Sequence, residues 1–265
     1  MIVRIPIRFS LLAFAMVLAI GVHAQKEPMR DRTNTSFKYG EQLTYRIHYG
    51  FVDAATATLK IDNNPKVIGG RNAYHVVGIG KTRGAFNWFY KVDDRYETFI
   101  DEKSICPLMF IRRVDEGGFK INQDLVFDQE YHVINSNGKQ FVSMPAYIQD
   151  MLSSFFYART IVYDNEKPGK IDSITSFVDN QVFNLKIKFV KYDTLKSDVG
   201  KIRCMLFEPI VQTGRVFKKS EDLTVWISDD KNHIPLRAQA NIFVGSIKMD
   251  LESYSGTVEE FTKLK

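Results

Sequence analysis

The residues that could carry chemistry are few in this 265-residue chain, and they follow no known catalytic pattern. Its five histidines are isolated from one another, and none has the spacing of a zinc-binding His or Cys motif. Residues 78–82 end in Gly-Lys-Thr like a phosphate-binding loop, but His75 stands where that motif needs glycine. A strand and an aromatic segment flank it where a helix is required. The sequence therefore predicts neither a metal centre nor a phosphate-binding loop.

Acid–base and nucleophilic catalysis also lack a signature. Adjacent carboxylates occur at Asp93-Asp94, Asp115-Glu116 and Asp229-Asp230. Neighbouring residues of a strand point to opposite faces, so such pairs suit acid–base catalysis poorly. No Gly-x-Ser-x-Gly segment is present, and Cys106 and Cys204 have no base close in sequence. The two cysteines are either buried free thiols or a disulfide pair. We expect a protein that is not an enzyme and uses no cofactor.

Three consecutive aromatic residues, Trp88, Phe89 and Tyr90, are the first candidates for binding. Three successive side chains cannot share one face of a strand, so at least one should be exposed or line an opening. One interpretation is that they cover the end of a β-sheet core. The other is that they form a hydrophobic lip for a ligand or partner.

A second group of candidates lies on the main predicted helix, at about residues 145–162. At about 100° per residue, Met151 and Phe155 belong to one broad apolar face, and Pro145 suits a helix start. Arg159 lies inside the same apolar arc and therefore needs carboxylate or carbonyl partners, or a path to solvent. It could form a salt bridge that pins the helix to the sheet, or contact an anion such as a lipid head group at a pocket mouth.

The elements that must position these residues are mostly strands. Residues 40–50 alternate apolar and polar side chains, and some dozen strands are predicted in all, with turn signals such as Asp115-Glu116-Gly117-Gly118 between them. The predicted fold class is mainly β, with a large curved antiparallel sheet, a barrel or half-barrel, packed around the main helix. A loose fit between sheet and helix would leave a cavity.

The first 24 residues have the features of a cleaved secretory signal. Arg4 and Arg8 precede an apolar run at 9–21, and an Ala-x-Ala-like site ends at Ala24. That run is short for a bilayer span, so we expect no transmembrane span in the mature chain. Removing the signal lowers the formal charge from +5 to +3, and the basic residues form no runs, which argues against nucleic acid.

Composition divides the mature chain simply. Polar residues 25–36 predict a flexible leader, residues 37–256 a single β-rich domain, and residues 257–265 a C-terminal tail. No linker-like tract of Pro, Gly and Ser interrupts the domain.

Four phrases in order, at residues 37–45, 89–94, 149–159 and 225–230 followed by 234–236, resemble a bacterial envelope family known as domain of unknown function 3108. The resemblance implies a secreted, mostly β envelope protein without an assigned reaction. The predicted architecture is also similar to the open barrels of the periplasmic lipoprotein-carrier group, in which a curved sheet with helical cover shelters acyl chains.

These observations predict a periplasmic protein of a Gram-negative envelope that binds or carries a lipid or another hydrophobic ligand. The alternative is a structural or protein-interaction component of the envelope without a ligand cavity. The candidate ligand-binding residues are Trp88, Phe89, Tyr90, Met151, Phe155 and Arg159.

Overall fold

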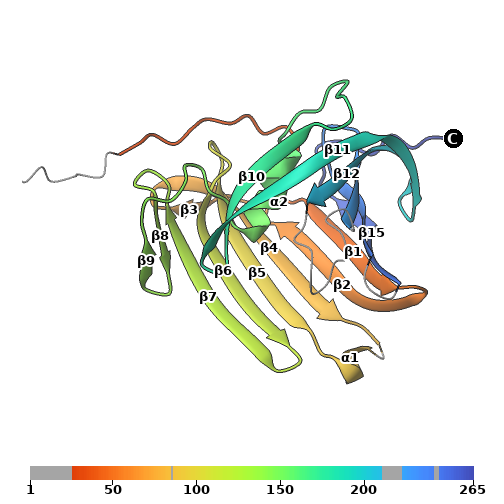
Figure 1. The fold of residues 1–265 in the computed structure, drawn as a ribbon, viewed down its shortest axis with the longest axis horizontal. Helices are drawn as coiled ribbons and strands as arrows, with labels where there is room; N and C mark the ends of the chain where they lie inside the picture. Colours follow the sequence, from red (N-terminus) through yellow and green to blue (C-terminus); the bar gives the residue numbers. More distant parts are fainter. Residues whose placement is uncertain (1–25, 85, 211–222, 242–244) are drawn as a thin grey trace, which may run out of the picture.

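The computed structural model describes residues 26–84, 86–210, 223–241 and 245–265. In these ranges the chain forms fifteen β-strands and two short α-helices (Figure 1). The mainly β fold class predicted from the alternating segments is confirmed. The predicted signal at residues 1–24 lies outside the described residues.

The strands follow one another along most of the chain. The first nine are β1 (Gln42–Tyr49), β2 (Val52–Ile61), β3 (Lys66–Ile68), β4 (Arg71–Thr82), β5 (Asp93–Asp101), β6 (Pro107–Glu116), β7 (Phe119–Asp128), β8 (Val133–Ser136) and β9 (Lys139–Phe141). The other six are β10 (Ile171–Val178), β11 (Gln181–Ser197), β12 (Gly200–Ile210), β13 (Leu223–Ser228), β14 (Pro235–Asn241) and β15 (Ser246–Ser255). Helix α1 (Phe86–Phe89) lies between β4 and β5, and α2 (Met151–Arg159) between β9 and β10.

All fifteen strands belong to one sheet that is not closed into a barrel. Its order is β10-β11-β12-β13-β14-β15-β1-β2-β4-β5-β6-β7-β8-β9, and β3 pairs only with β4. The pairing of β15 with β1 joins the last strand of the chain to the first, and every strand pair is antiparallel. In the centre of the sheet, Tyr45 of β1 lies opposite Leu251 on one side and Ala57 on the other.

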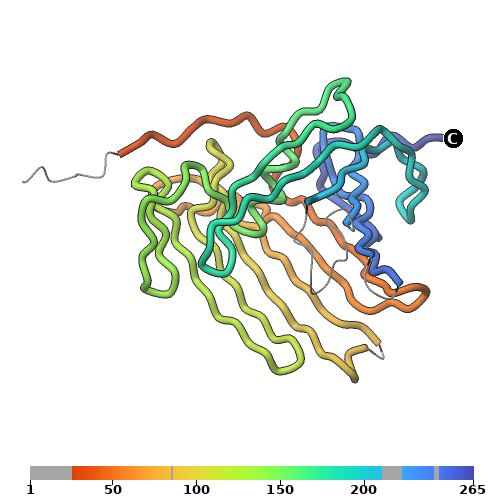
Figure 2. Tube along the Cα trace, in the orientation of Figure 1, coloured from red at the N-terminus to blue at the C-terminus, as the bar shows by residue number. Residues whose placement is uncertain are grey.

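The sheet folds over on itself to form the predicted half-barrel. Strands β10–β12 cross over the layer that contains β4–β6, and α2 lies between the two layers (Figures 1 and 2). Helix α2 contacts β5 on one side and β10 on the other. The turn between β10 and β11 is tied to the opposite layer, because Asp179 pairs with Arg112 at 2.7 Å and Asn180 accepts a hydrogen bond from Gln123 at 3.1 Å.

Helix α2 is shorter than the helix predicted over residues 145–162. Tyr147 has a φ of +59°, and the backbone of Gln149 pairs with β10, so this approach segment belongs to the sheet edge. Asp150 then caps the helix, accepting hydrogen bonds from two backbone amides of the first turn, and the helix ends at Arg159 with Thr160 as its C-cap. The apolar periodicity is compatible with a longer helix, but the pairing to β10 determines where it begins.

Both ends of the described chain contact the domain. In the segment predicted to be a flexible leader, Arg30 donates to the Ser104 carbonyl at 3.2 Å and Arg32 donates to the Thr160 hydroxyl at 2.5 Å. In the predicted tail, Phe261 is buried in the central apolar cluster. No helix of the described residues has the length and apolar character needed to cross a membrane.

Candidate functional site

A cavity of about 220 Å³ lies between α2 and the inner face of strands β11–β13. Its helix wall consists of Met151, Phe155 and Ala158, which are spaced at four and three residues and therefore lie along one stripe of α2. Its sheet wall is formed by apolar side chains of three adjacent strands: Leu185, Ile187, Met205, Phe207, Pro209, Val225 and Ile227.

The stripe faces open space because α2 uses its other sides to hold the fold. Phe156 is fully buried and packs edge-to-face against Phe37, with ring centroids 5.0 Å apart. Ser154 and Ser176 of β10 share a hydrogen bond of 2.6 Å. These contacts fasten the helix to the segment just before β1 and to β10, so the Met151 side is left facing β11–β13 across the cavity.

The sheet wall follows from period-two alternation. Met205 and Phe207 are two residues apart on β12 and point to the same face of the sheet. On the adjacent β13, Ile227 lies opposite Met205 and Val225 lies opposite Phe207. These cross-strand pairs form a continuous apolar surface opposite the helix.

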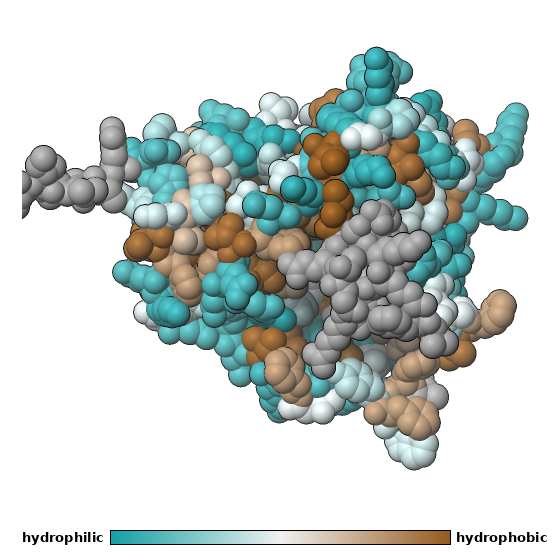
Figure 3. Space-filling view, in the orientation of Figure 1, coloured by the Kyte–Doolittle hydropathy of each residue, from teal (hydrophilic) through white to brown (hydrophobic). Residues whose placement is uncertain are grey.

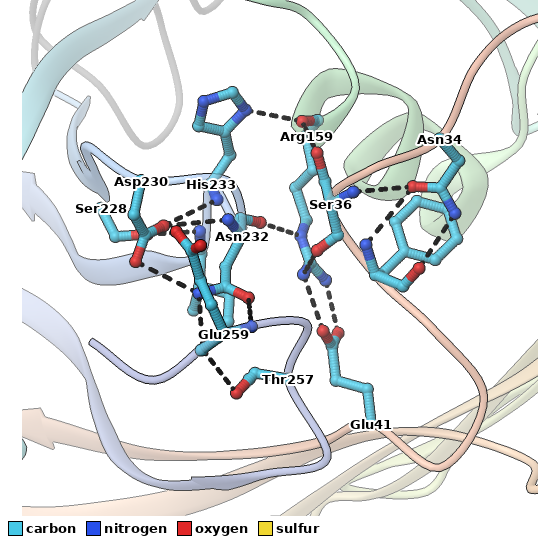
Figure 4. Close-up of polar contacts among 12 residues, drawn as sticks. Asn34, Ser36, Glu41, Arg159, Ser228, Asp230, Asn232, His233, Thr257 and Glu259 are labelled. Atoms are coloured by element: carbon cyan, nitrogen blue, oxygen red, sulfur yellow. Dashed lines mark hydrogen bonds and ion pairs between the residues drawn. The ribbon is translucent and has the colours of Figure 1, made fainter. Parts of the chain in front are cut away.

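One end of the cavity is bordered by Arg159, whose guanidinium is already engaged (Figure 4). It contacts both carboxylate oxygens of Glu41, at 2.5 and 2.8 Å, and donates to the carbonyls of Ser36 at 2.7 Å and Asn232 at 2.9 Å. Only 2% of the Arg159 side chain is exposed. Of the two roles predicted for Arg159, this geometry is that of the salt bridge that pins the helix to the sheet.

His233 lies beside Arg159 at the same end of the cavity (Figure 4). Its Nδ1 is 2.7 Å from the Arg159 carbonyl oxygen, and a carbonyl only accepts, so Nδ1 carries the hydrogen. The turn that carries His233 is held by Asp230, which accepts from the backbone amides of Asn232 at 3.0 Å and His233 at 3.3 Å.

The remaining polar groups at the cavity carry no uncompensated charge. Burial, together with a hydrogen bond to Asp172, raises the pKa of the Tyr163 hydroxyl, which therefore stays neutral. The Ser154 hydroxyl is engaged with Ser176 and with the Asp150 carbonyl. No group of three or more His, Cys, Asp or Glu side chains among the described residues could hold a metal ion. The cavity therefore suits an uncharged apolar group, with the His233 ring at one end.

Of the six residues predicted to bind a ligand, the structure brings three together. Met151, Phe155 and Arg159 line the cavity, whereas Trp88, Phe89 and Tyr90 are not among its lining residues. Phe89 and Trp88 belong to α1, and Tyr90 follows it, at the far tip of the β4–β5 connection. All three are exposed, so they do not cover the end of the core.

Sequence reasoning missed the sheet wall and His233. The alternation of Met205 and Phe207 on a predicted strand was a usable signal, because it marks two apolar side chains on one face. Which face meets the helix depends on how the sheet folds over, and no local pattern contains that information.

An open antiparallel sheet that curls around a helix and an apolar cavity places this chain among the barrel-like β proteins. It is similar in fold to a β-barrel-like protein of domain of unknown function 1849 from Brucella abortus, with a TM-score of 0.52 at 8% sequence identity. That alignment covers 83% of this chain and 98% of that chain.

The sequence then gives the family. A family model described as "Protein of unknown function (DUF3108)" matches residues 44–252, and the chain belongs to this family. The resemblance noted in the sequence is thereby confirmed. No curated protein matches the chain.

Two further solved structures align at lower similarity. A hypothetical protein, CT021, from Chlamydia trachomatis has a TM-score of 0.40 at 7% identity, over 87% of this chain and 94% of that chain. A candidate lipoprotein from Parabacteroides distasonis has a TM-score of 0.34 at 9% identity, over 85% of this chain and 100% of that chain.

Proposed function

We propose that the protein is an exported, non-enzymatic binding or carrier protein that holds the apolar part of a lipid or similar molecule beneath α2. The observation that carries the proposal is the cavity itself, whose helix and sheet walls are apolar. The polar groups at its border are engaged with the protein, since Arg159 is paired with Glu41 and Ser154 with Ser176. Such an environment favours burial of hydrocarbon and offers no activated nucleophile.

The size of the cavity favours a tail rather than a whole lipid. Pockets for drug-sized ligands are typically about 300–1,000 Å³, whereas a cavity of about 150 Å³ can hold benzene. At about 220 Å³, this cavity suits part of an acyl chain or one small ring. Met151, 39% exposed, marks the side at which the rest of such a ligand would reach solvent.

Export rests on the sequence. The signal features at residues 1–24 and the envelope character implied by the family resemblance both support it. Cleavage near Gln25 can be checked by intact mass of protein recovered from the periplasm.

The direct test measures bound species and then defined binding. Native mass spectrometry and solvent extraction of gently purified protein should reveal a bound lipid-like molecule. After delipidation, calorimetric titration with dodecanoic acid should show one binding site.

The substitution Ala158→Phe tests whether the ligand binds in this cavity. A ring at this position enters the cavity from the helix wall, so we expect affinity for dodecanoic acid to fall at least tenfold. Ala146→Phe is the matched control, because Ala146 is exposed and does not line the cavity. Absence of both extracted ligand and dodecanoic acid binding would overturn the proposal, as would equal binding by Ala158→Phe and the native protein.

A further inference from the structure

Four large aromatic side chains project from three neighbouring connections of the sheet. Phe51, between β1 and β2, is fully exposed. Trp88 and Phe89 of α1, between β4 and β5, are 84% and 76% exposed, and Phe119, at the start of β7, is 64% exposed. We call these four residues the aromatic edge. They lie outside the cavity lining, and the proposed ligand binding does not use them.

The topology places the three connections along one margin of the sheet. The strand order β1-β2-β4-β5-β6-β7 is antiparallel, so the β1–β2, β4–β5 and β6–β7 connections all fall at the same end. Neighbouring strands are about 4.8 Å apart, so successive tips are about 10 Å apart and the row extends for about 20 Å. Figure 1 shows the three tips along the lower right margin, and Figure 3 shows hydrophobic side chains projecting there.

Two of the tips are fixed to each other. The amide of Gly117, in the β6–β7 turn, donates to the Lys91 carbonyl at 2.8 Å, and Val92 forms a bridge with Glu116. The Tyr90 ring lies close over Gly117. These contacts hold the segment that carries Trp88 and Phe89 in place. The exposed position of these two apolar side chains is therefore fixed by the fold.

The arrangement fits a lipid surface better than a protein. The four rings project from three separate tips, so a rigid partner would need a matching recess at each tip, whereas a bilayer interface deforms around them. Tryptophan is also enriched at the membrane interface, and phenylalanine is common on interfacial apolar faces.

The charges near the edge agree with this choice. Lys91, which follows α1, is exposed and can approach lipid phosphates, and Arg83, which precedes α1, is exposed although it pairs with Glu252 at 3.5 Å. The acidic side chain at the β1–β2 tip, Asp53, pairs with Arg46 at 3.3 Å, and Asp115 at the β6–β7 tip pairs with Lys120 at 3.6 Å. We infer that the aromatic edge docks this protein onto a phospholipid bilayer by inserting these rings among the head groups.

Vesicles of phosphatidylethanolamine and phosphatidylglycerol test the inference directly. The chain has two tryptophans, so Trp226→Phe leaves Trp88 as the single tryptophan reporter. Its emission should shift to shorter wavelength when vesicles are added. In co-sedimentation, the triple substitution Phe51→Ser, Trp88→Ser and Phe119→Ser should weaken vesicle binding at least tenfold.

The matched control removes three exposed apolar side chains elsewhere on the protein: Val67→Ser, Tyr131→Ser and Val142→Ser. This control should bind vesicles like the native chain. Both triple variants alter exposed side chains and should keep the native melting temperature. The aromatic-edge variant should also keep dodecanoic acid affinity, which separates this test from that of the cavity.

The inference would be overturned if Trp88 emission did not shift at saturating vesicles, or if the two triple variants bound vesicles equally. It would also be overturned if the native protein bound no vesicles and instead dimerised through the aromatic edge. The last is recognised by sedimentation velocity, as a dimer that the aromatic-edge variant alone abolishes.

Discussion

Arg159 at the end of α2 and Glu41 just before β1 form an ion pair inside the protein, with nitrogen–oxygen distances of 2.5 and 2.8 Å. They are 118 residues apart in sequence, and their side chains are 2% and 1% exposed. The pair therefore fixes the helix that forms one wall of the cavity to the first strand of the sheet. Burial makes the pair dependent on both partners, because either charge alone would remain desolvated.

Arg159→Met should lower the free energy of unfolding by about 3–5 kcal/mol, because it leaves the Glu41 carboxylate buried without its partner. Guanidinium denaturation measures this change. Lys81→Met is the control, since Lys81 and Asp93 form an exposed pair with side chains 58% and 47% exposed, and its loss should cost less than about 1 kcal/mol. Equal costs for the two substitutions would contradict a structural role for Arg159. Adding Glu41→Leu to Arg159→Met should recover part of the loss.

Asp150, the buried cap of α2, predicts an unusual pH dependence. Burial raises the pKa of its carboxyl from the ordinary 3.8 to about 6, although hydrogen bonds from Thr98 and from the helix amides oppose the shift. Between these two values the folded state binds a proton more tightly than the unfolded state. The contribution of Asp150 to stability should therefore improve as the pH falls through this window, which is opposite to that of a salt-bridged carboxylate.

Asp150→Asn tests this prediction, because asparagine keeps the helix cap but cannot ionise. The variant should be more stable than the native protein near neutral pH, and its advantage should shrink by up to about 3 kcal/mol as the pH is lowered to about 4. Asp150→Ala loses the cap as well and should be less stable than the Asn variant by about 1 kcal/mol at every pH. If the stability advantage of Asp150→Asn over the native protein stayed constant or grew on acidification, the pKa of Asp150 would not be raised in the folded protein.

The two cysteines should be unreactive in the folded protein. Cys106 and Cys204 are both free and completely buried. Burial raises the pKa of both thiols, to about 12 for Cys204, so very little of the reactive thiolate exists near neutral pH. Ellman's reagent should label neither thiol in native protein and both after guanidinium is added. Rapid labelling of a native thiol, or an intact mass that shows a disulfide, would contradict this structure.

Local sequence patterns were enough to predict the sheet. Residues 40–50 alternate in polarity and contain β1 (Gln42–Tyr49), and the segment from Asp115 to Gly118 includes the turn between β6 and β7. Strand alternation and turn chemistry are decided by neighbouring residues, so one chain reveals them. The start of α2 could not be predicted from local pattern, because it depends on pairing between Gln149 and β10.

The candidate site was only half predictable for the same reason. The helical periodicity placed Met151, Phe155 and Arg159 on one helix face, and all three line the cavity. It could not identify Glu41 as the partner of Arg159, or Met205 as part of the facing wall, because both follow from how the sheet closes over the helix. Trp88, Phe89 and Tyr90 were predicted to belong to the same site, because the sequence pattern of aromatics exposed at a loop tip does not differ from that of aromatics at a pocket mouth.

Gly117 allows the packing beneath the aromatic edge to be measured. Its φ is +57°, and a Cβ atom built there would lie 2.6 Å from the Tyr90 ring. Gly50, in the β1–β2 turn, has the same φ of +57° with nothing within 4 Å, so Gly50→Ala reports the backbone strain alone, about 1–2 kcal/mol. Gly117→Ala should cost about 1 kcal/mol more in unfolding free energy, because the ring must move. With Tyr90→Ala in the background, this excess should vanish, as a double-mutant cycle can show. If Gly117→Ala lowers the free energy of unfolding no more than Gly50→Ala does, Tyr90 does not hold the α1 tip against the β6–β7 turn. The contact between Tyr90 and Gly117 would then not contribute to the rigidity of the aromatic edge.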